Sequence, residues 1–312
     1  MKPQIFIDGE HGTTGLQIRE RLSARDDIEM LSLAVEDRRD DAKRQSMLGS
    51  CDFAILCLPD DAAREAVSMI EASGNDRCRI IDTSTAHRTA EQWAFGFAEL
   101  DGEQSSKIRS AGRVSNPGCY STGAIALIKP LIDAGIMQSD MAISINAVSG
   151  YTGGGKNLIA RMEDASREDH IDTAFHLYAL PLKHKHVPEI MARSGLIKRP
   201  LFAPSVGRFP QGMLVSVPIH LEQMAGASVG SIHQALLQHY RGCEFVTVAS
   251  KEEISATSHI HPEDFADRDD MKLWVLGNTG TGHVNMVAQL DNLGKGASGA
   301  AVQNLNLMLG QA

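Results

Sequence analysis

The residue best suited to chemistry in this 312-residue sequence is Cys119, which follows the run Ser115-Asn116-Pro117-Gly118. The Pro-Gly pair favours a turn, and the apolar spacing over residues 121–134 predicts a helix directly after it. Cys119 should therefore fall at a helix N-terminus, where the helix dipole stabilises a thiolate and makes the sulfur a nucleophile. A buried structural thiol is the alternative interpretation, and it stays open on this evidence.

A thiolate that attacks an acyl group needs an acid/base partner, and His184 and His186 are the densest candidates. They are two residues apart, so in an extended chain they point the same way. Glu189 is placed to orient an imidazole. A metal-binding histidine pair and two surface histidines are the alternatives, but no third ligand has suitable spacing, so we predict no metal site.

A glycine-rich turn separates the first predicted strand from the first predicted helix, with Gly9, Gly12 and Gly15 in a G-x-x-G-x-x-G pattern and Thr13 and Thr14 within it. Such glycines allow a tight turn and a close approach of the backbone to a pyrophosphate at the helix N-terminus. These five residues are our candidate cofactor contacts. An ordinary turn between a strand and a helix is the alternative.

The second strand is followed by Glu36-Asp37-Arg38-Arg39. An acidic residue about 20 positions past the glycines suits the ribose hydroxyl of NAD, whereas arginine suits the 2′-phosphate of NADP, which makes Arg38 a further candidate. A solvated charge run is the alternative. The loop 149–157, SGYTGGGKN, nearly matches a phosphate loop, but Asn157 replaces the Mg²⁺-binding hydroxyl. We interpret the loop, with Gly150, as a backbone cradle near the cofactor or phosphate.

Strands and helices alternate in the first half of the chain, which predicts a parallel sheet covered on both faces. In the helix predicted over 16–24, Leu16, the Arg19 stem and Leu22 share one side. The second region, from Cys119 on, alternates less regularly and suits an α+β domain with a mixed sheet. The ranges that we predict as strands are 4–8, 28–34, 52–58, 79–82, 108–114, 141–148, 214–221 and 244–249; those predicted as helices are 16–24, 60–72, 121–134, 231–240 and 300–309.

Composition narrows the function classes. Apolar residues make up 43% and charged residues 22%, which is typical of a globular protein, and the net charge of −9 argues against nucleic-acid binding. No run of ~18 apolar residues suggests a membrane span. The N-terminal residues lead straight into a strand, so we expect a cytosolic location. Five cysteines at unrelated spacings do not suggest a disulfide framework.

Several stretches together resemble one known family. They are SNPGCYSTGAIALIKPL around Cys119, LKHKHVPEI, SGYTGGGK, IDTSTAHR at 81–88 and DNLGKGASGAAVQNLNLMLG at the C-terminal end. With them the chain resembles N-acetyl-gamma-glutamyl-phosphate reductase of arginine biosynthesis, in its shorter bacterial type. The resemblance extends from Gly9 to Gly310.

The resemblance implies a Rossmann-like NADP-binding domain (1–117, with 283–312 packing back) and an α+β catalytic domain (118–282) of the semialdehyde/glyceraldehyde-phosphate dehydrogenase kind. It implies that NADPH reduces an acyl phosphate to an aldehyde, with Cys119 forming a thioester and His184 and His186 as acid/base residues. Ser84, within IDTSTAHR, becomes a further cofactor candidate. The family also implies a homo-oligomer, a dimer or tetramer. Arg113, Lys183 and Arg208 are candidate contacts for the substrate's anionic groups.

Three other interpretations remain at this stage. A related semialdehyde dehydrogenase would act on aspartyl phosphate. A cysteine hydrolase or acyltransferase would carry the glycine turn for structural reasons alone and would bind no NADPH. A dinucleotide-sensing protein without chemistry would have no need for a reactive thiol at Cys119.

Overall fold

The computed structural model describes residues 1–224 and 226–311. The chain divides into two compact units: the first consists of Met1–Ala98, Glu103–Pro117 and Ala297–Ala312, and the second of Glu99–Gly102 and Gly118–Gly296. The sequence analysis placed residues 283–296 with the first domain, whereas here they lie in the second unit because residues 283–290 form a strand of its sheet.

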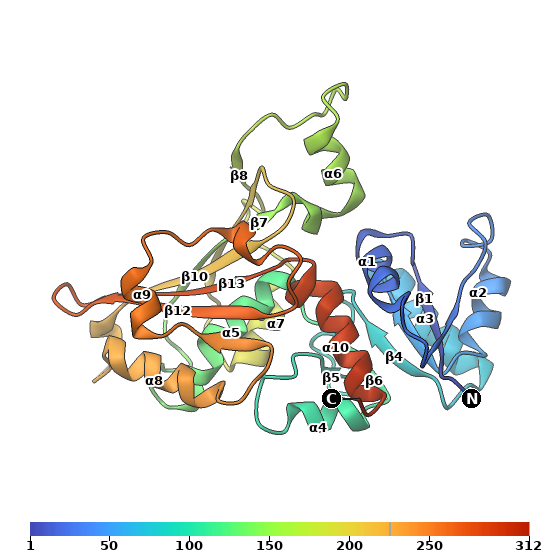
Figure 1. Ribbon diagram of the computed structural model, residues 1–312, viewed down its shortest axis with the longest axis horizontal. Coiled ribbons are helices and arrows are strands. Elements are labelled where there is room, and N and C mark those ends of the chain that lie inside the picture. Colours follow the sequence, from blue (N-terminus) through green and yellow to red (C-terminus); the bar gives the residue numbers. More distant parts are fainter. Residues whose placement is uncertain (225, 312) are drawn as a thin grey trace. The chain divides into compact units, whose positions relative to one another are not determined.

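A parallel sheet forms the centre of the first unit, with the strand order β2-β1-β3-β4-β6-β5 (Figure 1). This is the parallel α/β architecture that the alternation of strands and helices predicted. Its elements are β1 (Gln4–Asp8), α1 (Thr13–Leu22), β2 (Glu29–Leu31), α2 (Asp41–Leu48), β3 (Phe53–Leu56), α3 (Asp60–Ser73), β4 (Arg79–Asp82), β5 (Ala94–Phe95), α4 (Gln104–Ser110), β6 (Arg113–Ser115) and α10 (Gly299–Met308).

Helices cover both faces of this sheet. Ile5 and Ile7 of β1 pack in one apolar cluster with residues of α1, α4 and α10, whereas Phe6 packs in another with α2 and α3. The alternation follows from the two-residue period of a strand. The predicted strand over 108–114 was partly wrong, because Ile108 belongs to α4, whose apolar side it supplies to the first cluster.

The inner side of α1 also differs from the prediction. Gly15, Ile18 and Leu22 are its buried residues, while the Leu16 side chain is exposed and the Arg19 side chain is 48% exposed. The pattern i, i+3, i+7 is the helical period, starting one residue before the one that the sequence analysis chose. Arg19 therefore points outward from the unit's core.

The second unit is built on a mixed sheet with the strand order β11-β12-β13-β10-β7-β9-β8. Both parallel and antiparallel pairs occur, as expected for an α+β domain. Its elements are α5 (Cys119–Asp133), β7 (Ser144–Gly150), η1 (Tyr151–Gly154), α6 (Gly155–Glu163), β8 (Phe175–Leu177), α7 (Val187–Ser194), β9 (Leu201–Gly207), β10 (Met213–His220), η2 (Leu221–Gln223), α8 (Val229–His239), β11 (Val246–Val248), α9 (Lys251–Ala256), η3 (Pro262–Phe265), β12 (Met271–Asn278) and β13 (His283–Leu290). A short π-helix, η4, spans Gly294–Ser298.

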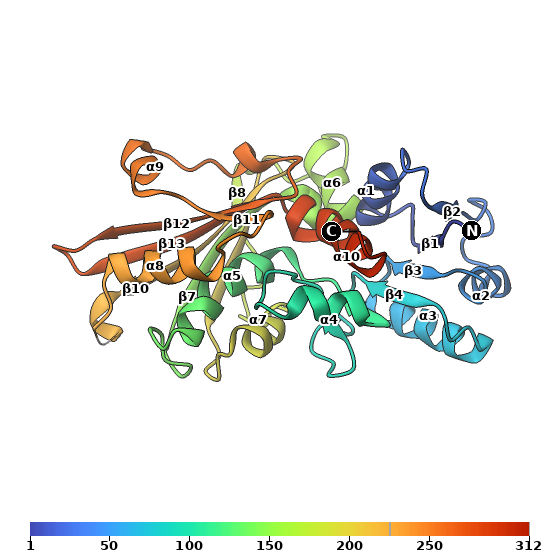
Figure 2. The ribbon, with the colours of Figure 1, turned by 60° about the horizontal axis from the view of Figure 1, so that its bottom comes forward.

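The two faces of this mixed sheet are not equivalent. Helices α5 and α8 cover one face, as Figure 2 shows, and Gly123 of α5 lies directly against Val215 and Ala288. Along β10, burial alternates, with Val215 and Val217 buried and Leu214 and Ser216 partly exposed on the opposite face. That opposite face is only partly covered, by the segment that includes α9 and η3.

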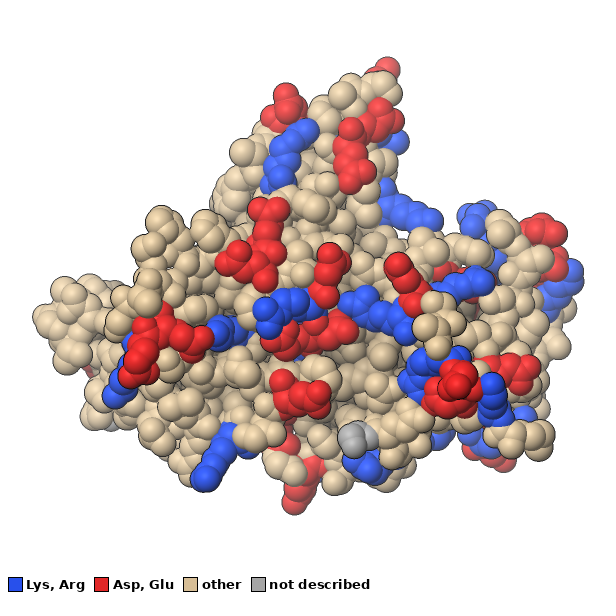
Figure 3. Space-filling view, viewed as in Figure 1, with Lys and Arg blue, Asp and Glu red and all other residues tan. Residues whose placement is uncertain are grey.

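Charged side chains of both signs are interspersed on the face shown in Figure 3. Many are paired locally, such as Arg161 with Asp169 and Arg268 with Asp270. Among the residues that the structure describes, no helix has both the length and the apolar character needed to cross a membrane.

The buried ion pair of Asp8 and Arg44 gives a test of the first unit. Arg44 Nη2 lies 3.0 Å from Asp8 Oδ2, and both side chains are almost fully buried. We expect Arg44→Met to lower the free energy of unfolding by about 3–5 kcal/mol, because the buried Asp8 side chain loses its ion-pair partner. Urea unfolding followed by circular dichroism measures this loss.

The exposed pair of Arg77 with Asp52 is the matched control. Arg77→Met should cost under about 1 kcal/mol, because solvent screens that pair. Adding Asp8→Asn to Arg44→Met should recover part of the loss. Equal losses for the buried and the exposed pair would contradict the role given to Arg44.

Candidate active site

Cys119 is the first residue of α5, and Gly118 is its N-cap residue in an extended conformation. The helix has no acidic residue in its first turn, and the cysteine is partly buried. The first N–H groups of a helix have no partners within it and carry the positive end of its dipole. The predicted placement of this sulfur at a helix start is thus what the structure shows.

Glu189 of α7 ties this helix start in place. Its side chain is buried, Oε1 accepts a hydrogen bond from the Gly118 N–H at 2.9 Å, and Oε2 accepts one from the Ser121 hydroxyl at 2.8 Å. Both of these bonds go to the start of α5, and the predicted role of Glu189 in orienting an imidazole stays a prediction. A buried carboxylate needs such donors, so the contact fixes α7 to the start of α5.

His184 and His186 lie together directly before α7, and their ring centroids are 4.7 Å apart. The His186 N–H donates to His184 Nδ1 at 3.2 Å, and His184 Nε2 lies 3.1 Å from the Tyr178 hydroxyl. Because Nδ1 accepts, the neutral ring carries its proton on Nε2. Burial, with the charge of Lys185, lowers the pKa of His184 to about 4, so this imidazole is neutral at pH 7.

Aromatic rings connect the histidines to the cysteine. Tyr120, the neighbour of Cys119 in α5, has its ring centroid 5.9 Å from that of His184 and 5.8 Å from that of His186. The Tyr120 hydroxyl donates to the Ser205 carbonyl at 3.0 Å, and burial raises the pKa of this tyrosine well above its usual range. Tyr120, which was not among the predicted site residues, is thus the chain neighbour of Cys119 and has its ring against both histidines.

The π-helix η4 backs the cysteine from another side. A Cβ atom added to Gly296 would lie 2.7 Å from Cys119 Cβ, so only glycine allows this close approach. The adjacent Lys295 is fully buried, and its Nζ donates to both carboxylate oxygens of Glu99, at 2.9 and 2.8 Å. This ion pair fixes η4 behind Cys119. The residues of η4 lie in the C-terminal stretch that carried the family resemblance. The contact of this segment with Cys119 had no local signal in the sequence.

The glycine turn lies in the first unit, between β1 and α1. Gly9 has a φ of +88°, which only glycine adopts at low cost, and Gly12 is the N-cap residue of α1. The Thr13 hydroxyl oxygen is buried and has no hydrogen-bond partner within the described residues. A turn with a glycine N-cap, Thr13 and Thr14 in the first helical turn and one orphaned hydroxyl fits a bound phosphate group.

The other predicted cofactor residues lie elsewhere. Arg38 belongs to the turn between β2 and α2, seven residues beyond the end of β2. Ser84 follows β4, and its hydroxyl donates to the buried Asp82 at 2.8 Å. Gly150 ends β7 in the second unit, where its N–H donates to the Gly212 carbonyl at 2.9 Å. The backbone that packs against Gly150 explains the missing side chain without a ligand.

Two of the three candidate anion contacts are already bound to protein atoms. Arg113 Nη2 donates to Glu71 at 2.7 Å, and Arg208 donates to the carbonyls of Ile171 and Met162. These bonds give both arginines a structural role that the sequence analysis had not foreseen. Among the described residues, no cluster of three or more His, Cys, Asp or Glu side chains could hold a metal ion.

Solved structures that the fold resembles include aspartate semialdehyde dehydrogenases. One is the enzyme II of Vibrio cholerae complexed with ASA, with a TM-score of 0.72, 15% identity and coverage of 99% of this chain and 98% of that one. Another is the enzyme of Candida albicans with NADP, with a TM-score of 0.68, 12% identity and 99% coverage of each chain. At such identities the likeness establishes the fold, an α/β unit with a second, mixed-sheet unit.

Sequence comparison is more specific. Residues 119–292 match the family model described as semialdehyde dehydrogenase, dimerisation domain. A protein of Allorhizobium ampelinum named N-acetyl-gamma-glutamyl-phosphate reductase is 59% identical over 310 residues, which is 99% of each chain. A protein of Brucella anthropi with the same name is 57% identical over 312 residues, the full length of both. The chain therefore belongs to the N-acetyl-gamma-glutamyl-phosphate reductase family of oxidoreductases.

Proposed function

We propose that this chain reduces N-acetyl-L-glutamyl 5-phosphate to N-acetyl-L-glutamate 5-semialdehyde with NADPH and releases phosphate, as a step of arginine biosynthesis. The names of its relatives support the substrate. The observation that carries the chemistry is a cysteine at the first position of a helix, followed by a tyrosine whose ring lies against two histidines. An acyl-transfer step requires that combination of nucleophile and acid/base group.

Cys119 is the proposed nucleophile. Its thiolate attacks the acyl carbon of the substrate; the new C–S bond forms, the bond from carbon to the phosphate oxygen breaks, and inorganic phosphate leaves. The product is a thioester, which accepts hydride more readily than an oxygen ester. Glu189 holds Gly118, the residue before Cys119, through a hydrogen bond. The ion pair of Lys295 with Glu99 holds Gly296, whose backbone lies against Cys119. These two contacts fix the position of the sulfur at the start of α5.

His186 is the proposed acid/base residue. It takes the thiol proton of Cys119, later protonates the alkoxide that develops on the former acyl carbon, and removes the hydroxyl proton when the aldehyde is released. The proposed role of His184 is different, because its ring nitrogens form hydrogen bonds with the His186 backbone N–H and the Tyr178 hydroxyl. Both ring nitrogens of this neutral imidazole are in hydrogen bonds. We therefore propose that His184 fixes the backbone at His186 and does not exchange protons near pH 7.

The first unit is the proposed dinucleotide-binding domain, and the second the catalytic one. The turn at Gly9 and Gly12, with Thr13 and Thr14, would hold the pyrophosphate, and the orphaned Thr13 hydroxyl would find its partner there. Ser84 follows β4, which is separated from β1 in the sheet by β3, and it is a further proposed contact. The bound cofactor supplies the hydride that reduces the thioester carbon.

The proposed location is the cytosol. Within the described residues, which include all five cysteines, each cysteine is a free thiol. Even Cys51 and Cys78, whose sulfur atoms are 3.6 Å apart, are not joined. Free thiols are the normal state in a reducing compartment, and the proposed reaction needs Cys119 in that state.

The function is tested by the reverse reaction, with N-acetyl-glutamate semialdehyde, phosphate and NADP⁺, followed by the absorbance of NADPH. We expect a kcat/KM for this aldehyde far above that for aspartate semialdehyde. Cys119→Ser should lower kcat at least about a thousandfold, because no thioester forms. Cys243→Ser, at another partly buried thiol of the same unit, is the control and should stay near the wild-type rate. A fully active Cys119→Ser variant would refute the mechanism.

The two histidines should separate by pH dependence. His186→Gln is expected to lower kcat by about 10²–10⁴-fold and to abolish the limb of the pH–rate profile that belongs to the base. His184→Asn should lower kcat but leave the shape of that profile unchanged between pH 5 and 9, because the pKa of His184 is about 4 and its ring is neutral throughout this range. Nitrogen-15 NMR of the wild-type rings provides an independent check, with the proton of His184 expected on Nε2. Loss of the limb in His184→Asn alone would reverse the two roles.

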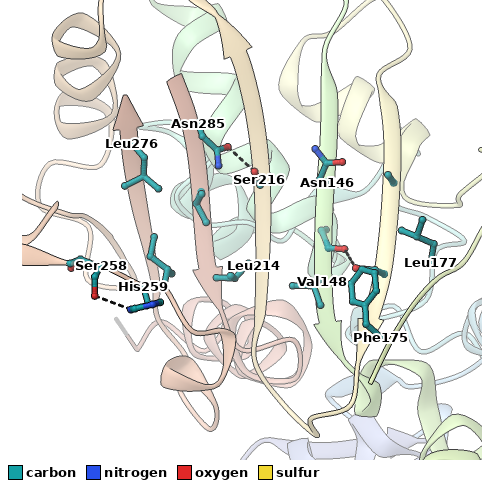
Figure 4. A pocket seen from close by; sticks show the side chains of 16 residues that line it. Asn146, Val148, Phe175, Leu177, Leu214, Ser216, Ser258, His259, Leu276 and Asn285 are labelled. Carbon is teal, nitrogen blue, oxygen red and sulfur yellow. Dashed lines mark hydrogen bonds between the residues drawn. The ribbon is translucent and has the colours of Figure 1, made fainter. Parts of the chain in front are cut away.

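We further propose that two copies of the chain associate through the open face of the mixed sheet. A cavity of about 530 Å³ lies on this face, and Figure 4 shows Val148, Leu214 and Leu276 pointing into it. Phe175 and Leu177 of β8 line the same cavity and are 56% and 54% exposed. Exposed apolar surface of this kind marks an association site, and the family model matching residues 119–292 is that of a dimerisation domain.

Charge on this face tests the association. Phe175→Glu with Leu177→Glu should convert a dimer to a 33.7 kDa monomer in light scattering, because burying two carboxylates in an apolar interface is unfavourable. Ile197→Glu is the control, since Ile197 is 72% exposed but lies outside the cavity lining. Unchanged mass in the double variant, or a monomeric wild type, would exclude this face.

A further inference from the structure

The end of β2 is the place in this architecture where a dinucleotide's adenosine ribose is recognised. Here β2 ends at Leu31, paired in register with Phe6 of β1, so the residue at the strand's end is Ser32. The run Glu36 to Arg39 begins five residues after that end, in the turn that leads to α2. Residues that contact the adenosine ribose are therefore expected around Ser32.

Three side chains meet at Ser32. The Ser32 hydroxyl donates to Glu10 Oε2 at 3.1 Å, and Arg19 Nη1 lies 2.6 Å from the same oxygen. Glu10 belongs to the glycine turn and its side chain is 7% exposed, whereas the Arg19 side chain, from α1, is 48% exposed. The imidazole of His11 is the next titratable group, with Nε2 3.7 Å from Glu10 Oε1.

The charges around Ser32 favour an anionic group over a neutral hydroxyl. A free carboxylate at this place would accept the ribose 2′-hydroxyl of NAD and repel a 2′-phosphate. Glu10 is not free, because one of its oxygens already accepts from Arg19 and Ser32. Among the described residues, Arg19 has no second ion-pair partner, so its remaining N–H groups are available to an anion from solvent. A guanidinium with a free edge is well suited to a phosphate.

We propose that Arg19 and Ser32 form the subsite for the adenosine 2′-phosphate of NADP, and that Glu10 is the positioning residue that holds Arg19 at the end of β2. The proposal rests on the dinucleotide-binding role given to the first unit. It assigns cofactor preference to these residues in place of Arg38, which the sequence analysis had suggested. Arg19 then does two things: it binds the 2′-phosphate and it masks the Glu10 carboxylate.

The masking leads to an asymmetric expectation. Arg19→Ala removes the phosphate contact and also uncovers Glu10, which then repels the 2′-phosphate and accepts the ribose hydroxyl. Affinity for NADP should fall about ten- to hundredfold, the range for one lost charge-assisted hydrogen bond, while affinity for NAD should stay equal or rise. Arg19→Ala combined with Glu10→Gln removes the uncovered charge, so part of the NADP affinity should return.

Isothermal titration of the full-length chain provides the test, with adenosine 2′,5′-bisphosphate and adenosine 5′-monophosphate as probes that lack nicotinamide. The wild type should bind the bisphosphate more tightly. Arg19→Ala should lose about ten- to hundredfold for the bisphosphate and little for the monophosphate, and Ser32→Ala should show a smaller loss of the same selectivity. Arg38→Ala and Arg39→Ala are the matched controls and should bind both probes as the wild type does.

The outcomes separate the two levels of the proposal. Equal bisphosphate affinity in the wild type and Arg19→Ala, or a loss confined to Arg38→Ala or Arg39→Ala, overturns the subsite assignment but leaves dinucleotide binding in place. A wild type that binds neither probe nor NADP overturns the role of the first unit and this inference with it. Thermal unfolding of each variant shows whether it is folded, and Arg19→Gln, which keeps most of the side-chain stem, repeats the test if Arg19→Ala is not.

Discussion

The candidate catalytic centre depends on one buried interaction, in which the Glu189 carboxylate accepts hydrogen bonds from the Gly118 N–H and the Ser121 hydroxyl. Glu189 belongs to the first turn of α7, directly after the histidines, and its two donors flank Cys119 at the start of α5. A carboxylate that is 1% exposed has a large desolvation cost unless strong donors saturate it. If α5 and α7 separated, the Glu189 carboxylate would lose these two hydrogen bonds. Because Cys119 begins α5 and His186 directly precedes α7, the same contact couples the positions of these two residues.

A second buried charge acts on the same cysteine from the opposite end of the chain. Lys295 and Glu99 form an ion pair with both groups excluded from solvent, and the next residue, Gly296, lies against Cys119. Desolvation offsets much of the attraction within a buried ion pair, but removing one partner leaves the other charge uncompensated, so the two segments stay together. The site thus combines two buried carboxylates, Glu99 and Glu189, with Cys119, and each carboxylate accepts hydrogen bonds from a different segment that contacts or flanks this cysteine.

The limits of sequence analysis follow from the range of the interactions involved. Strands β1 and β4 match their predicted ranges because a short apolar stretch of two or three residues between polar ones is a local signal. Cys119 was predictable because a Pro-Gly turn before a helix is local too. Lys295 and Glu99 are 196 residues apart and Glu10 and Ser32 are 22 apart, so neither pair leaves a pattern in any short window. Arg38 was predicted from its local charge run, whereas the proposed contact of Ser32 with Glu10 depends on where β2 ends, at Leu31.

The proposed association face and the histidines share one stretch of chain. Strand β8 supplies Phe175 and Leu177 to the open cavity, and the next residue, Tyr178, places its hydroxyl 3.1 Å from His184 Nε2. Between them and His186, Ala179 and Leu182 hold positive φ angles of 52° and 58°, which non-glycine residues adopt only when their surroundings impose them. A second copy seated on β8 would restrain this stretch from its exposed side, while the bond from His186 N–H to His184 restrains it from within. If two copies associate through this face, the contact would stabilise the backbone conformation on which the proposed acid/base geometry depends.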